Sequence, residues 1–280
     1  MKLVVVNALS VDVEEYYHAL VFQDGTRGLT RGGFESRVED SVERVLGLLD
    51  TREVRATFFV LGEVAIAHPA LVRKIAGNGH EIACHGHRHE LVSGQSPAEF
   101  RADVRQAKDV LEDLTGEPVL GYRAPNFSIG RAQRWAYDVL LEEGFRYDSS
   151  TYPILHDRYG DPGAPRFPHE VRRTGDRTLM EFPIGTARVG GVNWPVGGGG
   201  YFRLLPVTWI RRGIQRVNRL EGRPTMFYFH PWELDPDQPR PAMRWPHRVR
   251  HYVGMRRQAT KLAHLLESIR FTAARDLLGI

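Results

Sequence analysis

The chain has 280 residues, which is enough to bury a sizeable core in one large domain or in two. A hydrophobic fraction of 42% and a charged fraction of 26% are ordinary for a folded soluble protein. The net charge of +4 is too small to imply a nucleic-acid partner by itself, and the single cysteine, Cys84, excludes an intrachain disulfide.

The amino-terminal segment is apolar after Lys2 but is interrupted by Asn7, Ser10 and Asp12, so we do not expect it to be a signal peptide. No later stretch approaches the ~18 apolar residues that are needed to span a bilayer. We therefore expect a cytoplasmic protein, with peripheral attachment to the inner membrane as the alternative.

Strands and helices are predicted to alternate in the first half of the chain. Runs of β-branched residues predict buried strands, and apolar residues that recur on one face predict helices. The helix after Ser96 is the clearest, because Ser96 and Glu99 form a capping-box pattern around Pro97. The expected elements are a strand at 3–11, a helix at 34–51, a strand at 56–60, a helix at 64–76, a strand at 81–84, a helix at 96–114, a strand at 119–122 and a helix at 133–143.

The second half of the chain is predicted to have shorter strands and longer loops. Four consecutive glycines, Gly197 to Gly200, mark a loop where the backbone must bend or approach something closely. The alternation predicts a parallel α/β fold, either a barrel or an open sheet, with its active site beyond the carboxyl ends of the strands. Strands are expected at 145–147, 179–182 and 225–230, helices at 206–220 and 248–269, and surface loops at 157–168 and 235–246.

The candidate functional residues fall at these predicted strand ends. Asp12 and Glu14 end the first strand on the same side, because side chains alternate along a strand. His85 and His89 follow the third strand, and Arg123 follows the fourth. Asp148 follows the fifth strand, and His230 follows the last. Their common placement predicts a site at that end of the sheet.

The segment from Cys84 to His89 contains two histidines four residues apart, His85 and His89. On a helical turn such a pair shares one face and can chelate a metal, and an added carboxylate leaves positions open for water and substrate. His87 would point away from the pair. The alternative is a solvated, histidine-rich loop.

Three other residues have catalytic interpretations. A carboxylate such as Asp12 beside a metal can deprotonate the bound water, and His230 can protonate a leaving nitrogen. The alternative for His230 is a core histidine bonded to a backbone carbonyl. Arg123 can fix the carboxylate base, and the alternative is an exposed surface arginine.

A second histidine pair with the same spacing, His247 and His251, serves as a control. It lies in a basic run without a nearby acid, and a cationic surround opposes metal binding. We interpret the basic stretch 240–261 as a solvated face rather than a nucleic-acid or membrane surface, because no stacked-aromatic motif accompanies it.

From Leu3 to Pro231 the chain resembles a polysaccharide deacetylase of the NodB-homology type, carbohydrate esterase family four. Five motifs occur in family order: Ser10 to Glu14, His85 to His89, Arg123 to Pro125, Phe145 to Tyr152 with Asp148, and Tyr228 to His230. The resemblance implies that Asp12 is the base, that Glu14, His85 and His89 hold the metal, that Arg123 orients the base, and that His230 is the acid.

The chain departs from the common family pattern in two motifs. The acids of the first motif, which are adjacent aspartates in the common form, are separated here by Val13, and the second acid is glutamate, Glu14. The fourth motif commonly carries a tryptophan, for which Tyr152 or Trp194 must serve here. These features, together with the glycine run and the sequence from His230 through Trp232 to Glu233, resemble the exosortase-associated branch, which accompanies exopolysaccharide synthesis. We also take Tyr228 and Trp232 as substrate-binding candidates.

The resemblance implies a distorted (β/α)7 barrel and a single domain, 1–280, with the motifs in 3–233 and a carboxy-terminal extension at 234–280. It implies hydrolysis of N-acetyl groups on an amino-sugar saccharide with a divalent metal, for which zinc is expected and cobalt, nickel or manganese are alternatives. Two other interpretations stay open: hydrolysis of a small cyclic amide or ureide on the same fold, and an inactive sugar-binding protein. Oligomeric state is not predicted.

Overall fold

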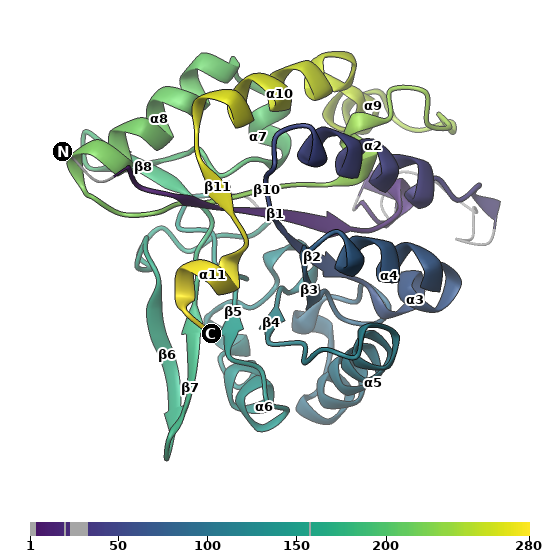
Figure 1. Ribbon diagram of the computed structural model, residues 1–280, viewed down its shortest axis with the longest axis vertical. Helices are drawn as coiled ribbons and strands as arrows, with labels where there is room; N and C mark the ends of the chain where they lie inside the picture. The colour runs from purple at the N-terminus through teal and green to yellow at the C-terminus, as the bar shows by residue number, and fades with distance from the viewer. Residues whose placement is uncertain (1–3, 20, 23–32, 157) are drawn as a thin grey trace.

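The computed structural model describes residues 4–19, 21–22, 33–156 and 158–280. Seven parallel strands form its central sheet in the order β10-β1-β2-β3-β4-β5-β7 (Figure 1). Their bounds are β1 Asn7–Val13, β2 Thr57–Val60, β3 Glu81–Cys84, β4 Gly121–Tyr122, β5 Tyr147–Asp148, β7 Arg177–Glu181 and β10 Met226–Phe229. At the edge, β6 (His169–Thr174) pairs antiparallel with β7.

The sheet curls until its two ends meet. Ile184, just after β7, pairs with Met226 of β10, and Gly198 pairs with Tyr228 of the same strand, both as isolated parallel bridges. The two edges of the curled sheet, β10 and the chain that follows β7, are therefore joined by two bridges rather than by a continuous ladder. This irregular closure confirms the expected distorted barrel of seven parallel strands.

Helices surround the barrel and cover the outer face of its strands (Figure 1). Their bounds are α2 Val38–Asp50, α3 Gly62–Ala67, α4 Pro69–Gly77, α5 Pro97–Thr115, α6 Ala136–Glu142, α7 Gly199–Leu204, α8 Val207–Leu220, α9 Trp245–Tyr252, α10 Gln258–Ser268 and α11 Ala274–Leu278. Short 3-10 helices lie at η1 Tyr16–His18, η3 Val92–Gly94, η4 Pro125–Phe127, η5 Arg131–Gln133, η6 Pro231–Leu234 and η7 Met255–Arg257. No helix in the described ranges is long and apolar enough to cross a membrane.

Alternation along β1 explains how polar side chains enter the barrel. Leu9 and Val11 belong to the core that packs under the helices, whereas Ala8 belongs to a second apolar cluster with Phe59 from β2. Because successive side chains point to opposite faces, Asp12 shares the inner face with Ala8. The pattern therefore sends the Asp12 carboxylate into the barrel.

Two predicted helices are each broken in the structure. The helix expected at 64–76 is split into α3 and α4 at His68, because the residue before a proline, here Pro69, is disfavoured in the helical region. The helix expected at 248–269 begins earlier, at Trp245, and is interrupted at Gly254, whose φ of 78° ends the helical run.

Other expected elements differ mainly at their ends. The strand at 3–11 is shifted to β1, and the capping box at Ser96 is confirmed, since the Ser96 and Glu99 side chains each accept the other's backbone N–H at 3.3 and 2.8 Å. Four of the described strands were not predicted: β6, the short β11 (Phe271–Thr272), and the hairpin formed by β8 (Thr186–Val189) and β9 (Val192–Pro195). Of the loop expected at 157–168, Asp157 lies outside the described residues.

The glycine run makes the close backbone approach that the sequence predicts. Gly198 has a φ of 106°, and a Cβ there would lie 1.9 Å from the carbonyl oxygen of Tyr228. A Cβ on Gly199 would lie 2.1 Å from the Tyr228 hydroxyl. Glycine is therefore required where this segment seats against β10, beside the carboxyl end of the barrel.

The carboxy-terminal segment closes the opposite end. β11 (Phe271–Thr272) pairs with the start of β1, and α11 follows it across the barrel (Figure 1). The buried Glu81 carboxylate accepts hydrogen bonds from the Thr57 hydroxyl at 2.5 Å and the Arg275 backbone N–H at 3.1 Å. Burial raises the pKa of Glu81.

Candidate metal and catalytic site

The candidate residues converge at the carboxyl ends of three strands. Asp12 lies in β1 and Glu14 directly after it, His85 and His89 lie in the loop after β3, and His230 follows β10. All five line one cavity of about 640 Å³. The sequence-based expectation that these side chains meet at one end of the sheet agrees with this arrangement.

Three of these side chains form a compact set of metal-ligand atoms. One ligand atom each from Glu14, His85 and His89 lies within 4.8 Å of the others, and all three residues are buried. Glu14 Oε2 lies 2.6 Å from His89 Nε2 and 3.9 Å from His85 Nε2. Among the described residues, no donor makes a well-oriented hydrogen bond to Glu14 Oε2. A buried, unsatisfied carboxylate oxygen facing two imidazoles fits a cation-binding site.

Protonation states also suit metal binding. Burial lowers the pKa of His85 to about 4, so its imidazole is neutral at physiological pH. Its Nδ1 donates to the Arg123 carbonyl at 2.8 Å, which directs the Nε2 lone pair toward Glu14. Burial alone would raise the pKa of Glu14, but the facing histidines His89 and His230 lower it below its ordinary value.

The histidine pair does not lie on a helical turn, contrary to the expectation. Residues 85–90 form a loop after β3, and His89 itself has a φ of 57°, in the left-handed region. The ring of His18 stacks on His89 with centroids 5.4 Å apart, and its Nε2 contacts Glu63 at 2.9 Å. The left-handed backbone of His89 costs conformational free energy in a non-glycine residue, and it persists where packing enforces it.

Asp12 is held by a fully buried arginine. Arg123 Nη1 donates to Asp12 Oδ1 at 2.5 Å and to the Ser10 hydroxyl at 2.9 Å. The other edge of the guanidinium donates to the backbone carbonyl and the hydroxyl of Ser149, at 3.0 and 2.8 Å. The Arg123 Cζ lies 4.1 Å from the Phe59 ring centroid. The structure thus excludes the alternative of an exposed surface arginine.

His230 is held by a carboxylate that sequence reasoning did not assign. Its Nδ1 donates to Glu233 Oε1 at 2.9 Å, and Gln258 of α10 donates to Glu233 Oε2 at 2.9 Å. The His230 Nε2 faces Glu14 Oε1 at 3.6 Å. Burial by itself would lower the pKa of His230, but Glu14 and Glu233 overcome it and raise the pKa to about 9. The spacing of three residues between His230 and Glu233 was the available signal.

Trp232 contacts a ligand candidate directly. Its indole N–H donates to Glu14 Oε1 at 3.1 Å, and its ring stacks between His230 and His251, with centroid distances of 4.9 and 4.7 Å. His251 is buried and donates to Gln238 Oε1 at 2.8 Å, so this part of the basic stretch is not the solvated face that we expected. Neither His251 nor His247 belongs to a metal-ligand group in the part of the chain that the structure describes.

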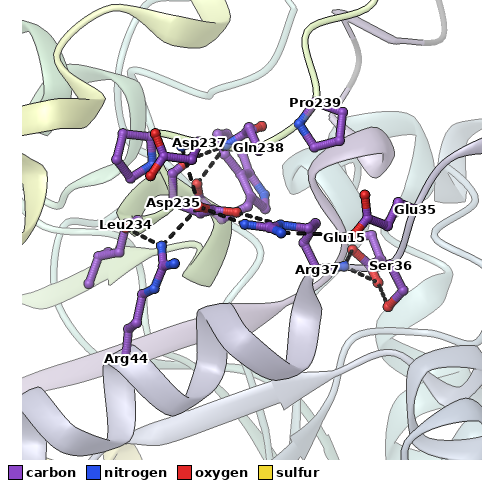
Figure 2. A network of polar contacts seen from close by, with 12 residues as sticks. Glu15, Glu35, Ser36, Arg37, Arg44, Leu234, Asp235, Asp237, Gln238 and Pro239 are labelled. Carbon is purple, nitrogen blue, oxygen red and sulfur yellow. Dashed lines mark hydrogen bonds and ion pairs between the residues drawn. The ribbon is translucent and has the colours of Figure 1, made fainter.

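A polar clamp joins the segments that carry Glu14 and Trp232 (Figure 2). The buried Asp235, after η6, accepts from Arg37 Nε at 2.9 Å and from Arg44 Nη1 at 2.9 Å. The Arg37 backbone N–H in turn donates to Glu15 at 3.0 Å. Burial alone would raise the pKa of Asp235, but the two arginines lower it.

Three predicted residues lie elsewhere. Asp148 is buried, accepts a hydrogen bond from the Ser150 hydroxyl at 2.5 Å and is not among the described residues that line the cavity. Tyr152 is also buried and lines an adjoining cavity instead. Trp194 is exposed on β9 beside Trp209 and lines neither cavity, because the unpredicted hairpin turns it away. Tyr228 and Trp232 do line the cavity.

Two family models match successive segments of the chain. One, for polysaccharide deacetylases, matches residues 10–140, and one for a domain of unknown function (DUF3473) matches residues 149–279. The chain is 27% identical over 137 residues to a peptidoglycan deacetylase of Helicobacter pylori, covering 49% of this chain and 44% of that protein. It is 28% identical over 140 residues to a peptidoglycan-N-acetylglucosamine deacetylase of Bacillus cereus, covering 46% and 50%. The chain thus spans about half the length of these curated relatives.

Solved structures share the architecture over nearly the whole chain. A Mycobacterium smegmatis protein classed as a polysaccharide deacetylase has a TM-score of 0.64 and 23% identity, covering 98% of this chain and 88% of that one. Puue allantoinase has a TM-score of 0.62 and 17% identity, covering 97% and 88%. At such identities these likenesses show the fold. The motifs, the match over residues 10–140 and the curated relatives together show that this segment is a polysaccharide deacetylase domain of the NodB-homology type.

Proposed function

We propose that this chain is a metal-dependent N-deacetylase of an amino-sugar saccharide. The observation that carries the proposal is that the ligand set Glu14, His85 and His89 lines the same cavity as a restrained carboxylate, Asp12, and a restrained imidazole, His230. A binding protein has no need of both a base and an acid beside a metal site. The residues present therefore favour hydrolysis over sugar binding alone.

The donor set indicates which cation would fit. Glu14, His85 and His89 would hold a divalent metal, which supplies Lewis-acid polarisation of the amide carbonyl and lowers the pKa of the attacking water. Two imidazoles and one carboxylate suit zinc, and cobalt, nickel and manganese are the alternatives.

The chain's own groups would perform the proton transfers. Asp12 takes a proton from the attacking water, while Arg123 keeps the Asp12 carboxylate oriented. Addition of the hydroxide to the acetamido carbon gives a tetrahedral species. As its C–N bond breaks, protonated His230 gives the Nε2 proton to the leaving nitrogen. The products are acetate and the amino sugar as its ammonium ion, and transfer of the Asp12 proton to His230 restores both groups.

The shape of the site favours an extended saccharide over a small cyclic amide. Tyr201, Tyr228 and Trp232 give the cavity aromatic walls, which suit the apolar faces of sugar rings. A larger cavity of about 1530 Å³ adjoins it and shares, among others, Phe127 and Tyr159 in its lining. The match to the second family model agrees with a role in exopolysaccharide synthesis.

We further propose that the two matched segments form one catalytic domain, 1–280. The amino-terminal segment supplies Asp12, Glu14 and the metal-binding histidines, and the carboxy-terminal segment supplies His230 and Glu233. β10, from the second segment, pairs with β1, from the first. Neither segment has a complete set of site residues.

The function is tested by measuring acetate release from N-acetylglucosamine oligomers in parallel with ring opening of cyclic ureides and imides. The proposal predicts metal-dependent acetate release and no ring opening. Ring opening without acetate release would show a cyclic amide hydrolase. Saccharide binding without either reaction, in protein with a full complement of metal, would show a binding protein.

Two variants separate the proposed roles of ligand and base. His85→Ala should lose bound metal and activity together, whereas Asp12→Asn should keep the metal and lose activity by about 10²- to 10⁴-fold. His247→Ala, which alters the control pair, should match the wild type in both measurements. A fully active Asp12→Asn variant would contradict the assignment of the base.

A further inference from the structure

The mouth of the cavity carries exposed apolar side chains. Trp245 is 74% exposed, Leu204 62% and Val249 42%, and all three line the cavity. Leu155, at 86% exposure, precedes His156, whose Nε2 lies 3.5 Å from Arg250 on α9. Exposed apolar side chains that gather at one rim, rather than singly over the surface, indicate a site of interaction with a protein or a membrane.

The same rim is strongly cationic. From residue 238 to residue 266 the sequence has no aspartate or glutamate, while arginines recur throughout. Arg244, Arg248 and Arg250 flank Trp245 and Val249 along α9, and all three are exposed. Figure 1 places α9 and the loop before it at the end of the molecule toward which the β1 arrow points, which is the end that carries the site.

Helix α9 is therefore fixed on one side and available on the other. His251 is buried against Trp232, and Met255 after the helix is buried too. Trp245 and Val249 are four residues apart, so they share a helical face. A tryptophan and an aliphatic residue bordered by arginines form the composition that lies in a membrane interface and attracts anionic lipid. The composition alone had favoured a solvated face, and the exposed rim changes that interpretation.

We propose that this rim, formed by α9, Leu204 and Leu155, docks on the surface of an anionic lipid bilayer. The cavity then faces the membrane, and its substrate is a saccharide carried on a lipid. The second statement rests on the proposed deacetylase function, but the docking does not. A protein partner or a second copy of this chain on the same rim would cover the cavity entrance. A bilayer would instead bring a lipid-anchored substrate to that entrance.

Vesicle co-sedimentation of the full chain tests the docking. We expect binding to vesicles of equimolar phosphatidylcholine and phosphatidylglycerol and much weaker binding to phosphatidylcholine alone. Trp245→Ala and the double variant Arg244→Glu/Arg248→Glu should each lower the partition coefficient about tenfold or more. Matched controls are Trp209→Ala and Arg219→Glu, which alter exposed side chains on α8, away from the rim, and should bind as the wild type does.

Each contrary outcome overturns the docking. Equal binding to neutral and anionic vesicles, or no binding to either, would do so, as would control variants that lose as much binding as the rim variants. Full vesicle binding by Trp245→Ala would indicate a site for soluble polyanions instead. A dimer in sedimentation velocity that Trp245→Ala dissociates would identify the rim as a contact between copies.

Activity on soluble substrate separates this inference from the proposed function. The Arg244→Glu/Arg248→Glu variant should release acetate from soluble N-acetylglucosamine oligomers at the wild-type rate, because neither arginine lines the cavity. Asp12→Asn should still bind anionic vesicles. Vesicle binding without any deacetylation would refute the function but not the docking, and the reverse result would refute the docking alone.

Discussion

His230 shows how one side chain can be prepared for proton transfer by its neighbours. Glu233 fixes the Nδ1 side of the imidazole through a 2.9 Å hydrogen bond, which leaves Nε2 to face the cavity. Glu233 is completely buried, and Gln258 satisfies its other oxygen. Glu233 acts on the reaction through its hydrogen bond to His230, so we assign it as a positioning residue for the acid.

Glu233→Gln should therefore slow the departure of the leaving nitrogen more than the attack of water on the carbonyl carbon. The amide must receive a proton as its C–N bond breaks, whereas an activated aryl acetate leaves without one. We expect hydrolysis of the N-acetyl substrate to fall by about 10²-fold, and hydrolysis of 4-nitrophenyl acetate to change little. Initial rates on the two substrates, measured at equal metal content, give the ratio.

A merely structural role for Glu233 would lower both rates in the same proportion, which is the result that would reject this assignment. Trp194→Ala is the control, since Trp194 lies outside the cavity and should leave both rates unchanged.

At this scale the sequence predicted most of the side chains that meet but not how they are held. Asp12, His85 and His230 were found because parallel strands bring their carboxyl ends to one edge. Glu233 was missed because its role depends on a 3-10 turn after β10 and on Gln258, far along the chain. The position of Trp194 outside both cavities could not be foreseen, because nothing in the pattern revealed the β8–β9 hairpin that carries it.

At the scale of elements, the clamp around Asp235 couples α2 to the turn that carries Trp232 (Figure 2). Arg37 and Arg44 stand at the start and in the middle of α2, and both donate to the same buried carboxylate. Since the Arg37 N–H also holds Glu15, next to Glu14, the clamp fixes two segments that reach the site. Its loss should therefore affect both folding and metal binding.

Asp235→Asn should lower the free energy of unfolding by about 2 kcal/mol, because two charged donors lose an ionised partner. Metal affinity should fall as well, since Glu14 and Trp232 become less restrained. Urea denaturation and metal titration provide the two measurements. Asp237→Asn changes an exposed carboxylate two residues away and should be neutral. An Asp235→Asn variant with wild-type stability would show that the clamp contributes nothing measurable.

Local sequence signals explain which elements could be predicted. α5 was predicted almost to the residue, because its capping box is a local device that tertiary packing did not override. The strands β6, β8 and β9 were missed because they are largely exposed and lack the apolar runs that mark buried strands. The break at Gly254 was missed because a single glycine inside a helical pattern is an ambiguous signal.

At the scale of the whole molecule, the candidate site and the closed end lie at opposite ends of the barrel. The site residues lie at the carboxyl ends of the strands, whereas β11 and α11 seal the amino-terminal end. There Phe271 and Ala274 are buried, and the Ala274 N–H donates to the Thr57 hydroxyl at 2.8 Å. This division implies that the end of the chain contributes to stability and not directly to catalysis.

A chain that ends at Ile269, and so lacks β11 and α11, tests that division. Loss of the buried Phe271 alone should lower the free energy of unfolding by roughly 3 kcal/mol, and the opened barrel end adds to that loss. Below its lowered melting temperature, the shortened chain should still bind metal and release acetate at a rate close to that of the full chain. A chain that ends at Leu278 lacks only the last two residues and should melt as the full chain does. If the shortened chain were folded but inactive, the two ends of the barrel would be coupled, and the carboxy-terminal segment would have a part in shaping the site.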